Sequence, residues 1–179
     1  MSTSPSVQTN LQGFERRRRR GKTLPLPKKI EKLSFATLCE RPTHIPKPKR
    51  LKGAKAKGVA FERKVVRAIA RMKLGQLRYH QWVQYHDEAL GSGFCEPEAF
   101  FVFPNKIVLF EAKLTGGPLG KLQMEWLYKP LLEFIFKRPV VCLLVCKYKT
   151  ADTPGPFVAS PEEFLAKEYS FATWHWIGD

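Results

Sequence analysis

Two neighbouring apolar runs constrain the fold of this chain more than any other feature. Residues 99–103 (Ala-Phe-Phe-Val-Phe) and 107–114 (Ile-Val-Leu-Phe-Glu-Ala-Lys-Leu) are separated by Pro104-Asn105-Lys106. Runs of β-branched and aromatic residues on both sides of a short polar turn are typical of a β-hairpin. We therefore expect a buried antiparallel pair of strands at the centre of the folded part of the chain.

Helical and strand patterns surround this hairpin. Phe61, Val65, Ala68 and Met72 recur at helical spacing, which predicts a helix over about 58–73. Further strands are expected at 81–86, 139–147 and 173–177, a loop at 91–93, and helices at 118–136, bent at Pro130, and from Ser160 onward. The order α, β, β, β, α, β, α, β predicts an α/β fold with a central mixed sheet flanked by helices.

Positive charge is concentrated in the N-terminal third of the chain. Residues 1–57 contain 16 Lys and Arg against 3 Asp and Glu, a net charge of +13, whereas residues 58–179 contain 15 against 13, a net charge of +2. We divide the chain into a basic, Pro-rich arm at 1–57, mostly disordered or extended, and a folded domain at 58–179. One apolar patch in the arm, residues 33–38, could dock on the domain.

The cysteines and the hydropathy pattern bear on the compartment. Cys39, Cys95, Cys142 and Cys146 form no CxxC pair, and we interpret them as free thiols in a reducing compartment. No apolar run approaches the roughly 18 residues of a membrane span, and the N-terminus lacks the apolar segment of a signal peptide. We expect an intracellular, cytoplasmic protein of a bacterium or virus-infected cell without a membrane partner. The Arg run and the Ser/Thr-bearing N-terminus leave the nucleus or an organelle as alternatives.

Acidic and basic side chains cluster at the end of the predicted hairpin. Glu111 and Lys113 are two residues apart on a strand and therefore share one face, and Pro97-Glu98 directly precedes the other strand. Two carboxylates brought together repel each other unless a cation lies between them. We expect Glu98 and Glu111 to hold Mg²⁺, or Mn²⁺, because hard divalent ions prefer oxygen ligands.

These groups suit phosphodiester hydrolysis. A bound divalent ion lowers the pKa of its water and stabilises charge on a phosphate under attack, while Lys113 would position or activate that water. Glu62, at the edge of the apolar stripe of the first helix, could reach the metal or its waters, although it could also pair with Arg63 or Arg67. Gln123, a polar side chain on an apolar helix face, could orient a water. A Glu-x-Lys pair alone is more typical of a solvated strand face.

Residues 58–147 resemble the core of the PD-(D/E)XK nuclease superfamily, particularly its RecB-like and Holliday-junction-resolvase-like branches. In that family a helical Glu, a Pro-Asp at a strand start, a Glu-x-Lys on the next strand and often a Gln on the next helix form the site. The resemblance implies a restriction-endonuclease-like αβββαβ core. Glu98 stands where the family has Asp, and Glu96 is an alternative ligand with the same strand parity. The implied catalytic residues are Glu62, Glu98, Glu111, Lys113 and Gln123, and the implied metal ligands are Glu62, Glu98 and Glu111.

The site requires a particular register of the hairpin. Directly opposed residues of an antiparallel pair point to the same face. A three-residue turn at 104–106 would place Glu98 opposite Ala112, on the wrong face. We therefore predict a loop of two or four residues, or a bulge.

Together these features predict a DNA-binding, metal-dependent deoxyribonuclease. We expect a stand-alone endonuclease of the junction-resolvase kind, working as a homodimer in DNA recombination or repair, from a phage-like source. A RecB-like exonuclease, a catalytically inactive nucleic-acid-binding or assembly module, and a ribosomal-type RNA-binding protein are the alternatives. The Trp174-His175-Trp176 strand is most simply a sheet edge, or else stacks bases. The expected nucleic-acid contacts are Arg16, Arg17, Arg18, Arg19, Arg20, Lys22, Lys28, Lys29 and Lys121.

Overall fold

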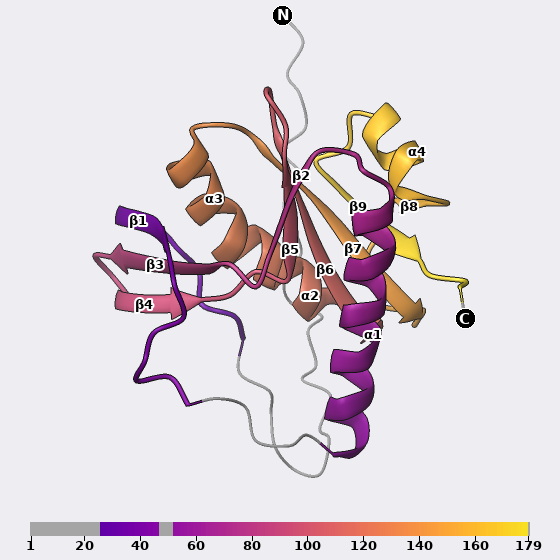
Figure 1. Ribbon diagram of the computed structural model, residues 1–179, viewed down its shortest axis with the longest axis horizontal. Coiled ribbons are helices and arrows are strands. Elements are labelled where there is room, and N and C mark those ends of the chain that lie inside the picture. The colour runs from indigo at the N-terminus through magenta and orange to yellow at the C-terminus, as the bar shows by residue number, and fades with distance from the viewer. Residues whose placement is uncertain (1–25, 47–51, 179) are drawn as a thin grey trace, which may run out of the picture.

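A six-stranded mixed sheet forms the centre of the molecule in a computed structural model that describes residues 26–46 and 52–178 (Figure 1). The strand order is β2-β5-β6-β7-β9-β8. The pairs β2–β5 and β5–β6 are antiparallel, and the remaining pairs are parallel. The expected α/β fold with a central mixed sheet is confirmed. The strands are β2 Gln76–Tyr79, β5 Ala99–Val102, β6 Ile107–Thr115, β7 Val140–Tyr148, β8 Phe157–Val158 and β9 Phe171–His175.

Helices cover both faces of this sheet. On one face, α1 (Gly53–Arg71) and α4 (Pro161–Ala166) pack with the side chains of β6 that include Val108 and Phe110. The other face is covered by the continuous helical segment α2 (Pro118–Gln123), η2 (Met124–Tyr128) and α3 (Lys129–Phe136). Successive residues of β6 therefore alternate between two apolar cores, as the period of a strand requires.

The start of α1 differs from the prediction. The helix begins at Gly53, so the predicted domain boundary between residues 57 and 58 falls inside it. Its first turns, Gly-Ala-Lys-Ala-Lys, lack the apolar residues on which the predicted start relied, but Ala and Lys favour helix without a core contact. The helix therefore extends past the apolar stripe of Phe61, Val65 and Ile69, all of which are buried.

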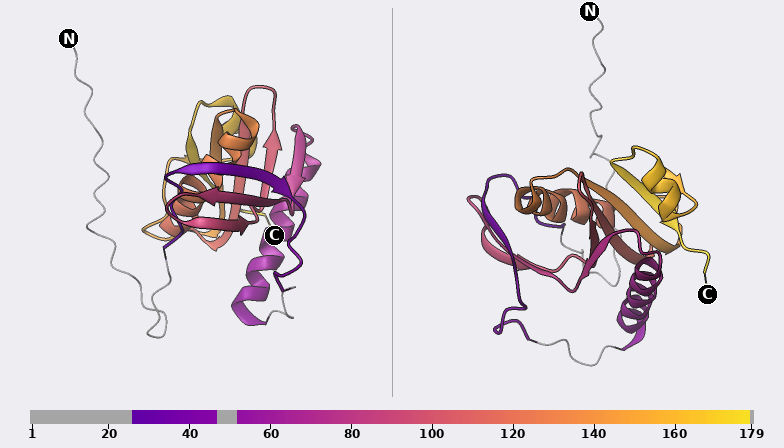
Figure 2. Two further views of the ribbon diagram at one scale, coloured as in Figure 1. Left: turned by 90° about the vertical axis from the view of Figure 1, so that its left-hand side faces the viewer. Right: turned by 45° about the horizontal axis from the view of Figure 1, so that its top comes forward.

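A second, three-stranded antiparallel sheet lies beside α3 (Figure 2). It consists of β1 (Leu33–Cys39), β3 (Trp82–Asp87) and β4 (Gly91–Cys95), with β3 in the middle. The apolar patch predicted at 33–38 therefore packs on the folded domain, where it forms strand β1 and pairs with β3. The loop predicted at 91–93 is wrong, because these residues pair with β3. Strand β2 also went unpredicted, since Gln76–Tyr79 is short and largely polar.

The helix that follows β6 is irregular at one point. The bend expected at Pro130 takes the form of a π-helical segment, η2, in the turn directly before the proline. Proline has no backbone N–H, so the regular hydrogen-bond pattern is interrupted at this turn and resumes in α3.

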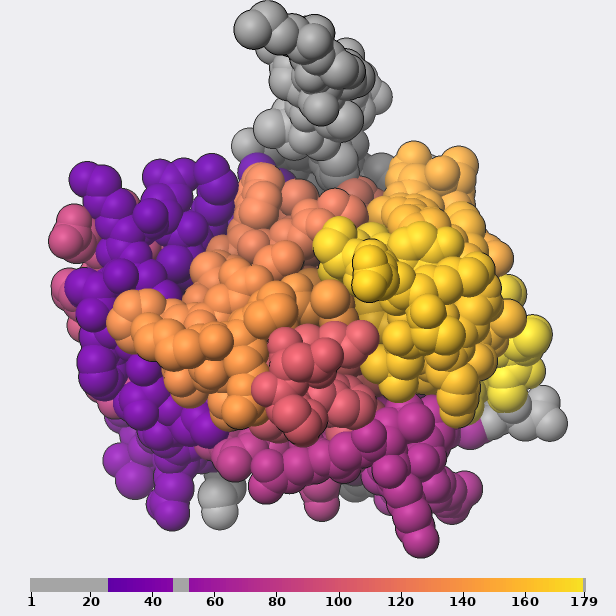
Figure 3. Space-filling view, turned by 90° about the horizontal axis from the view of Figure 1, so that it is seen from above, coloured from indigo at the N-terminus to yellow at the C-terminus, as the bar shows by residue number. Residues whose placement is uncertain are grey.

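The β5–β6 hairpin has the register that the site requires. Ala99 pairs with Phe110 and Val102 with Ile107, and Phe103 N–H donates to the carbonyl of Lys106. The loop between the last paired residues, 103–106, therefore has an even number of residues, as the site requires. Continuing the same register one residue beyond the Ala99–Phe110 pair places Glu98 opposite Glu111. The hairpin turn lies at the end of the sheet seen from above in Figure 3. Glu98 directly precedes β5, at the end of that strand away from the turn, and Glu111 lies in the middle of β6.

None of the helices in residues 26–46 and 52–178 has the length and apolarity needed to cross a bilayer. All four cysteines are free, and Cys142 and Cys146 are buried in β7 as small apolar side chains. Arg16, Arg17, Arg18, Arg19, Arg20 and Lys22, the core of the predicted nucleic-acid arm, lie outside the described residues.

Candidate active site

Glu98 and Glu111 approach each other where β5 begins, at a point from which β6 continues without a β5 neighbour. The ladder between these strands stops at the Ala99–Phe110 pair, so residues 111–115 have β7 on one side and no β5 neighbour on the other. The Glu98 side chain closes this open edge, because its Oε2 accepts a hydrogen bond from the backbone N–H of Ala112. A carboxylate thus replaces the strand carbonyl that a longer β5 would supply.

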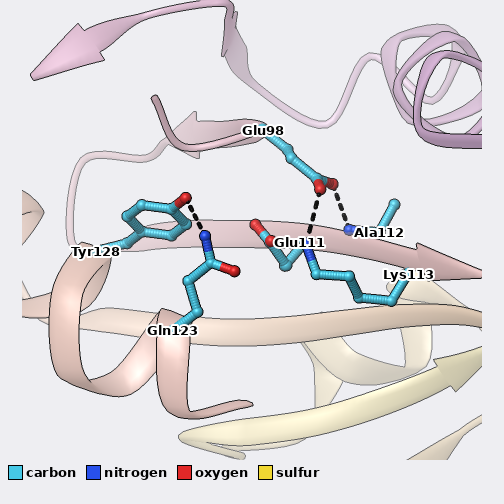
Figure 4. Close-up of polar contacts among 6 residues, drawn as sticks. All are labelled: Glu98, Glu111, Ala112, Lys113, Gln123 and Tyr128. Carbon is cyan, nitrogen blue, oxygen red and sulfur yellow. Dashed lines mark hydrogen bonds and ion pairs between the residues drawn. The ribbon is translucent and has the colours of Figure 1, made fainter. Parts of the chain in front are cut away.

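Lys113 connects the two acids. Its Nζ lies 3.3 Å from Glu98 Oε1 and donates a hydrogen bond to Glu111 Oε1 (Figure 4). Burial opposes the charge on Lys113, but the carboxylates of Glu111 and Glu98 outweigh it and hold the pKa of the ammonium above its ordinary value. Lys113 is therefore a fixed cation beside the two acids.

The two acids are poorly hydrated, which affects their ionisation. Glu111 is 1% exposed. Burial raises its pKa, and Lys113 partly offsets that effect. Burial and the nearby charge of Glu111 together raise the pKa of Glu98 well above its ordinary value. Two such carboxylates cost free energy unless a cation compensates them.

The donor chemistry of these residues fits a hard divalent cation. Within the described part of the chain, Glu111 Oε2 is buried and has no hydrogen-bond partner. An orphaned carboxylate oxygen of this kind is costly and suits an oxygen-preferring ion. No three His, Cys, Asp or Glu side chains of the described residues lie close enough to form a complete protein cage. Magnesium sites commonly use one or two carboxylates together with waters and phosphate oxygens.

Glu62 faces the same place from α1. A pocket of about 280 Å³ opens between α1 and the end of β6, and its walls include Lys55, Glu62, Glu98 and Lys113. Burial raises the pKa of Glu62, and the charge of Lys113 lowers it. The structure therefore brings Glu62 to the wall of the pocket that also contains Glu98 and Lys113, and its charge acts on the buried Glu111.

Gln123 lies on the opposite side of the site. Its side chain points from the end of α2 towards Glu111, and its Nε2 donates to the hydroxyl of Tyr128 (Figure 4). Burial, with a contribution from Glu111, raises the pKa of Tyr128 well above its ordinary value, so the hydroxyl keeps its proton. Tyr128 was not among the predicted site residues.

Gly120 allows α2 to lie directly against this site. A Cβ at this position would meet Leu144 Cδ1 at 2.9 Å and Lys113 Cγ at 3.5 Å. A larger residue would push α2, and Gln123 with it, away from β6. Gly120 also was not predicted.

Glu96, the alternative ligand, has a different partner. Its Oε1 lies 3.1 Å from Nδ1 of His80, at the turn between β2 and β3. Its charge acts on Glu62, so it lies near the rim of the pocket. The structure therefore brings Glu98 into contact with Lys113 and opposite Glu111, whereas Glu96 pairs with His80.

The described lysines predicted to bind nucleic acid are partly engaged in other contacts. Lys29 Nζ lies 2.9 Å from Glu31, and Lys121 Nζ lies 2.6 Å from Glu125. Lys121 also lies over the ring of Phe171, 5.0 Å from its centroid. Lys28 is exposed. Lys55, which was not among the predicted contacts, lies at the pocket itself.

No protein-family model matches the chain, and no curated protein or solved structure is significantly similar to it.

Proposed function

We propose that this chain is a Mg²⁺-dependent nuclease of the PD-(D/E)XK type that hydrolyses DNA phosphodiester bonds. The observation that carries the proposal is the buried pair Glu98 and Glu111, linked by Lys113, with Glu111 Oε2 lacking a partner in the described chain. A scaffold gains nothing from two desolvated carboxylates that face each other, whereas a metal site requires them.

Each residue of the site has a distinct role in this proposal. Glu98 and Glu111 would hold the divalent ion, with Glu62 in the pocket wall binding one of its waters. When bound, the ion would supply a water of lowered pKa and stabilise charge on the scissile phosphate. Lys113, kept cationic by the two acids, would orient the attacking water and offset charge on the phosphate. The Gln123–Tyr128 pair would fix the inner wall of the site.

We further propose that the fold contains an αβββαβ core and that the chain cleaves DNA as a junction-resolvase-like endonuclease. In this core, α1 would be followed by the main-sheet strands β2, β5 and β6, then by the helical segment from α2 to α3 and by β7. Strands β3 and β4 lie between β2 and β5 in the chain and belong to the second sheet, so they would be an insertion into that core, and β3, the strand predicted at 81–86, would not be one of its three strands. A RecB-like exonuclease would use the same residues and differ in products, since it would leave covalently closed circles intact.

A catalytically inactive nucleic-acid-binding module is the second candidate. The observation that favours it is the ion pair between Lys113 and Glu111, because an ammonium can neutralise the acids without a metal. Metal binding separates the two functions. A nuclease should bind Mn²⁺ in a manner that depends on Glu111, and an inactive module should not.

The test is cleavage of plasmid, linear, single-stranded and branched DNA with Mg²⁺, Mn²⁺ or EDTA. Glu98→Gln, Glu111→Gln and Lys113→Ala should bind DNA yet cleave at least about 100-fold more slowly. Glu163→Gln is a matched control for Glu98→Gln, because Glu163 also accepts a backbone N–H, that of Ala159, and pairs with a lysine, Lys167. The control should cleave like the wild type. A folded, DNA-binding protein that cleaves none of the four substrates would refute the proposal.

A further inference from the structure

Two exposed aromatic side chains lie near the candidate site. Tyr148 ends β7 and Phe157 begins β8. Tyr148 is 56% exposed and Phe157 is 47% exposed, although most aromatic residues of this sheet are buried. Aromatic side chains are enriched at binding interfaces relative to the rest of a protein surface.

Strand register places both rings on the face of the sheet that carries Glu111 and Lys113. Lys113 pairs with Cys146, and Thr115 pairs with Tyr148. Leu144, the partner of Glu111, pairs with Thr173, which in turn pairs with Phe157. Paired residues in a sheet point to the same side, as do residues two apart on one strand. From the rise and spacing of strands, the backbones of Lys113 and Tyr148 lie about 8 Å apart.

Two lysines accompany the aromatic rings. Lys147 Nζ lies 5.9 Å from the ring centroid of Tyr148, and Lys149 Nζ lies 4.2 Å from that of Phe157. Each exposed ring therefore has a lysine beside it: Lys147 beside Tyr148, and Lys149 beside Phe157 of β8. We refer to Lys147, Tyr148, Lys149 and Phe157 as the β7–β8 patch.

The β7–β8 patch is fixed relative to the candidate site. Gly116, which follows the strand of Lys113, donates its N–H to the carbonyl of Tyr148 at 2.8 Å. The carbonyl of Gly116 accepts hydrogen bonds from the hydroxyls of Thr150 and Thr153, both at 2.9 Å. These bonds tie the loop after Tyr148 to the end of β6, so a ligand that contacts the patch has a defined position with respect to Lys113.

We propose that the β7–β8 patch binds unpaired bases of a DNA strand, so that the substrate class is DNA with a single-stranded segment beside the scissile bond. Only the position of the scissile bond rests on the proposed nuclease function, whereas binding of bases by the β7–β8 patch does not. Exposed rings stack on bases of any sequence, and adjacent lysines neutralise the phosphates between them. A base paired inside a duplex is already stacked and offers no free face to Tyr148 or Phe157.

The strand of Trp174, His175 and Trp176, for which the sequence suggested a sheet edge or base stacking, is not at the edge, because β9 lies between β7 and β8. Packing of its two tryptophans argues against base stacking there. Trp174 is 8% exposed and belongs to the core that includes Phe61. The ring of Trp176 packs edge-on against Phe61 at 6.2 Å. These tryptophans therefore contribute to the packing between β9 and α1, whereas the rings of the β7–β8 patch point into solvent.

Binding of the full chain to a labelled oligothymidylate and to a blunt duplex, measured by fluorescence anisotropy in EDTA, tests the patch without cleavage. Tyr148→Ala and Phe157→Ala should each bind the single strand about tenfold more weakly, which is the loss of one stacked base. Both variants should bind the duplex as the wild type does. Tyr148→Phe should retain single-strand binding, because it keeps the ring and removes only the hydroxyl. Phe35→Ala, at a phenylalanine of similar exposure (44%) in the other sheet, is the matched control and should change neither affinity.

A separate measurement addresses the lysines. Replacing Lys147 and Lys149 together by Ala should make the salt dependence of single-strand binding shallower, by about 0.7 in the log–log slope for each phosphate that the variant leaves without a lysine. Tyr148→Ala should leave that slope unchanged. Wild-type single-strand affinity in both ring variants would overturn the proposal.

The outcomes also separate the two proposals. A wild-type protein that cleaves DNA, with ring variants that bind single strands normally, would refute the patch alone. Ring variants that lose single-strand affinity, in a protein that cleaves no substrate, would refute the nuclease activity and leave the patch as a binding surface.

Discussion

The backbone N–H of Ile30 donates to the carbonyl of Trp126 at 2.9 Å. In a regular α-helix that carbonyl would accept from residue 130, which is Pro130 and has no N–H to donate. The segment before β1 therefore supplies a donor that the helix lacks. Because Trp126 lies between Gln123 and Tyr128 of the candidate site in the chain, this bond also anchors the basic arm at Ile30 close to that site.

Ile30→Pro removes this donor and should lower the free energy of unfolding. The expected loss attributable to the hydrogen bond is about 1 kcal/mol. In a Pro130→Ala background the helix regains its own donor, so the cost of Ile30→Pro should shrink by that amount. Urea unfolding of the four proteins of this double-mutant cycle measures the difference. Equal costs in the two backgrounds would show that Ile30 contributes only through its side chain.

Asp87 forms a second anchor for the same segment, and its contribution depends on pH. Burial alone would raise its pKa, but four backbone N–H donors, from Glu31, Lys32, Ala89 and Leu90, outweigh burial and hold the pKa below its ordinary value. A carboxyl group with a lowered folded-state pKa stabilises the fold above its unfolded pKa, which is about 3.9. That stability is lost as the pH falls through the lower folded-state pKa.

Asp87→Asn should therefore destabilise the protein at neutral pH, because one amide cannot accept all four bonds. The difference in unfolding free energy from the wild type should be constant above about pH 5 and should diminish below about pH 4. Glu88→Gln, at an exposed neighbour, is the control and should change stability little at any pH. A difference that persists unchanged in acid would mean that the charge of Asp87 is not what stabilises the fold.

Much of the six-stranded sheet could be predicted because its strands are long and apolar. Strands β6 and β7 are almost entirely buried, and such runs leave few alternatives. Strand β4, Gly-Ser-Gly-Phe-Cys, could not be predicted, since glycine and serine are typical of loops. Only pairing with β3 makes it a strand, and local sequence does not contain that information.

The acidic part of the site was likewise accessible from sequence. The spacing of Glu111 and Lys113 fixed their common face, and the parity of the hairpin loop decided whether Glu98 joined them. The contact between Gln123 and Tyr128 was not accessible. In an α-helix two residues five positions apart point about 140° away from each other. The π-helical segment before Pro130 brings them together, and sequence periodicity assumes that no such segment exists.

Bound metal should stabilise the fold through Glu111. A divalent ion that compensates the two acids binds only the folded protein, so Mn²⁺ or Mg²⁺ at 100 times its dissociation constant should add about 2.7 kcal/mol to the free energy of unfolding. Thermal unfolding with metal and with EDTA should show this shift in the wild type and in Glu163→Gln, but not in Glu111→Gln. Lys113→Met should bind Mn²⁺ more tightly than the wild type, because the ammonium competes with the ion for Glu98 and Glu111. A shift of equal size in Glu111→Gln would place the metal elsewhere.

The arginine run should act on DNA through charge alone. Residues 16–20 are five consecutive arginines, and Ile30 and Asp87 anchor the chain that follows them. Each phosphate neutralised on a duplex contributes about 0.9 to the slope of log affinity against log salt concentration. Replacing all five arginines by Gln should therefore make that slope shallower by as much as about 4.5. Replacing them by Lys keeps the charge and should keep the slope. An arm that reads sequence would instead lose specificity with Lys, because lysine lacks the planar, two-pronged donor of arginine. Anisotropy titrations of duplexes of different sequence, across a series of salt concentrations, distinguish these cases. A Gln variant that retains the wild-type slope would show that the run does not contact phosphates.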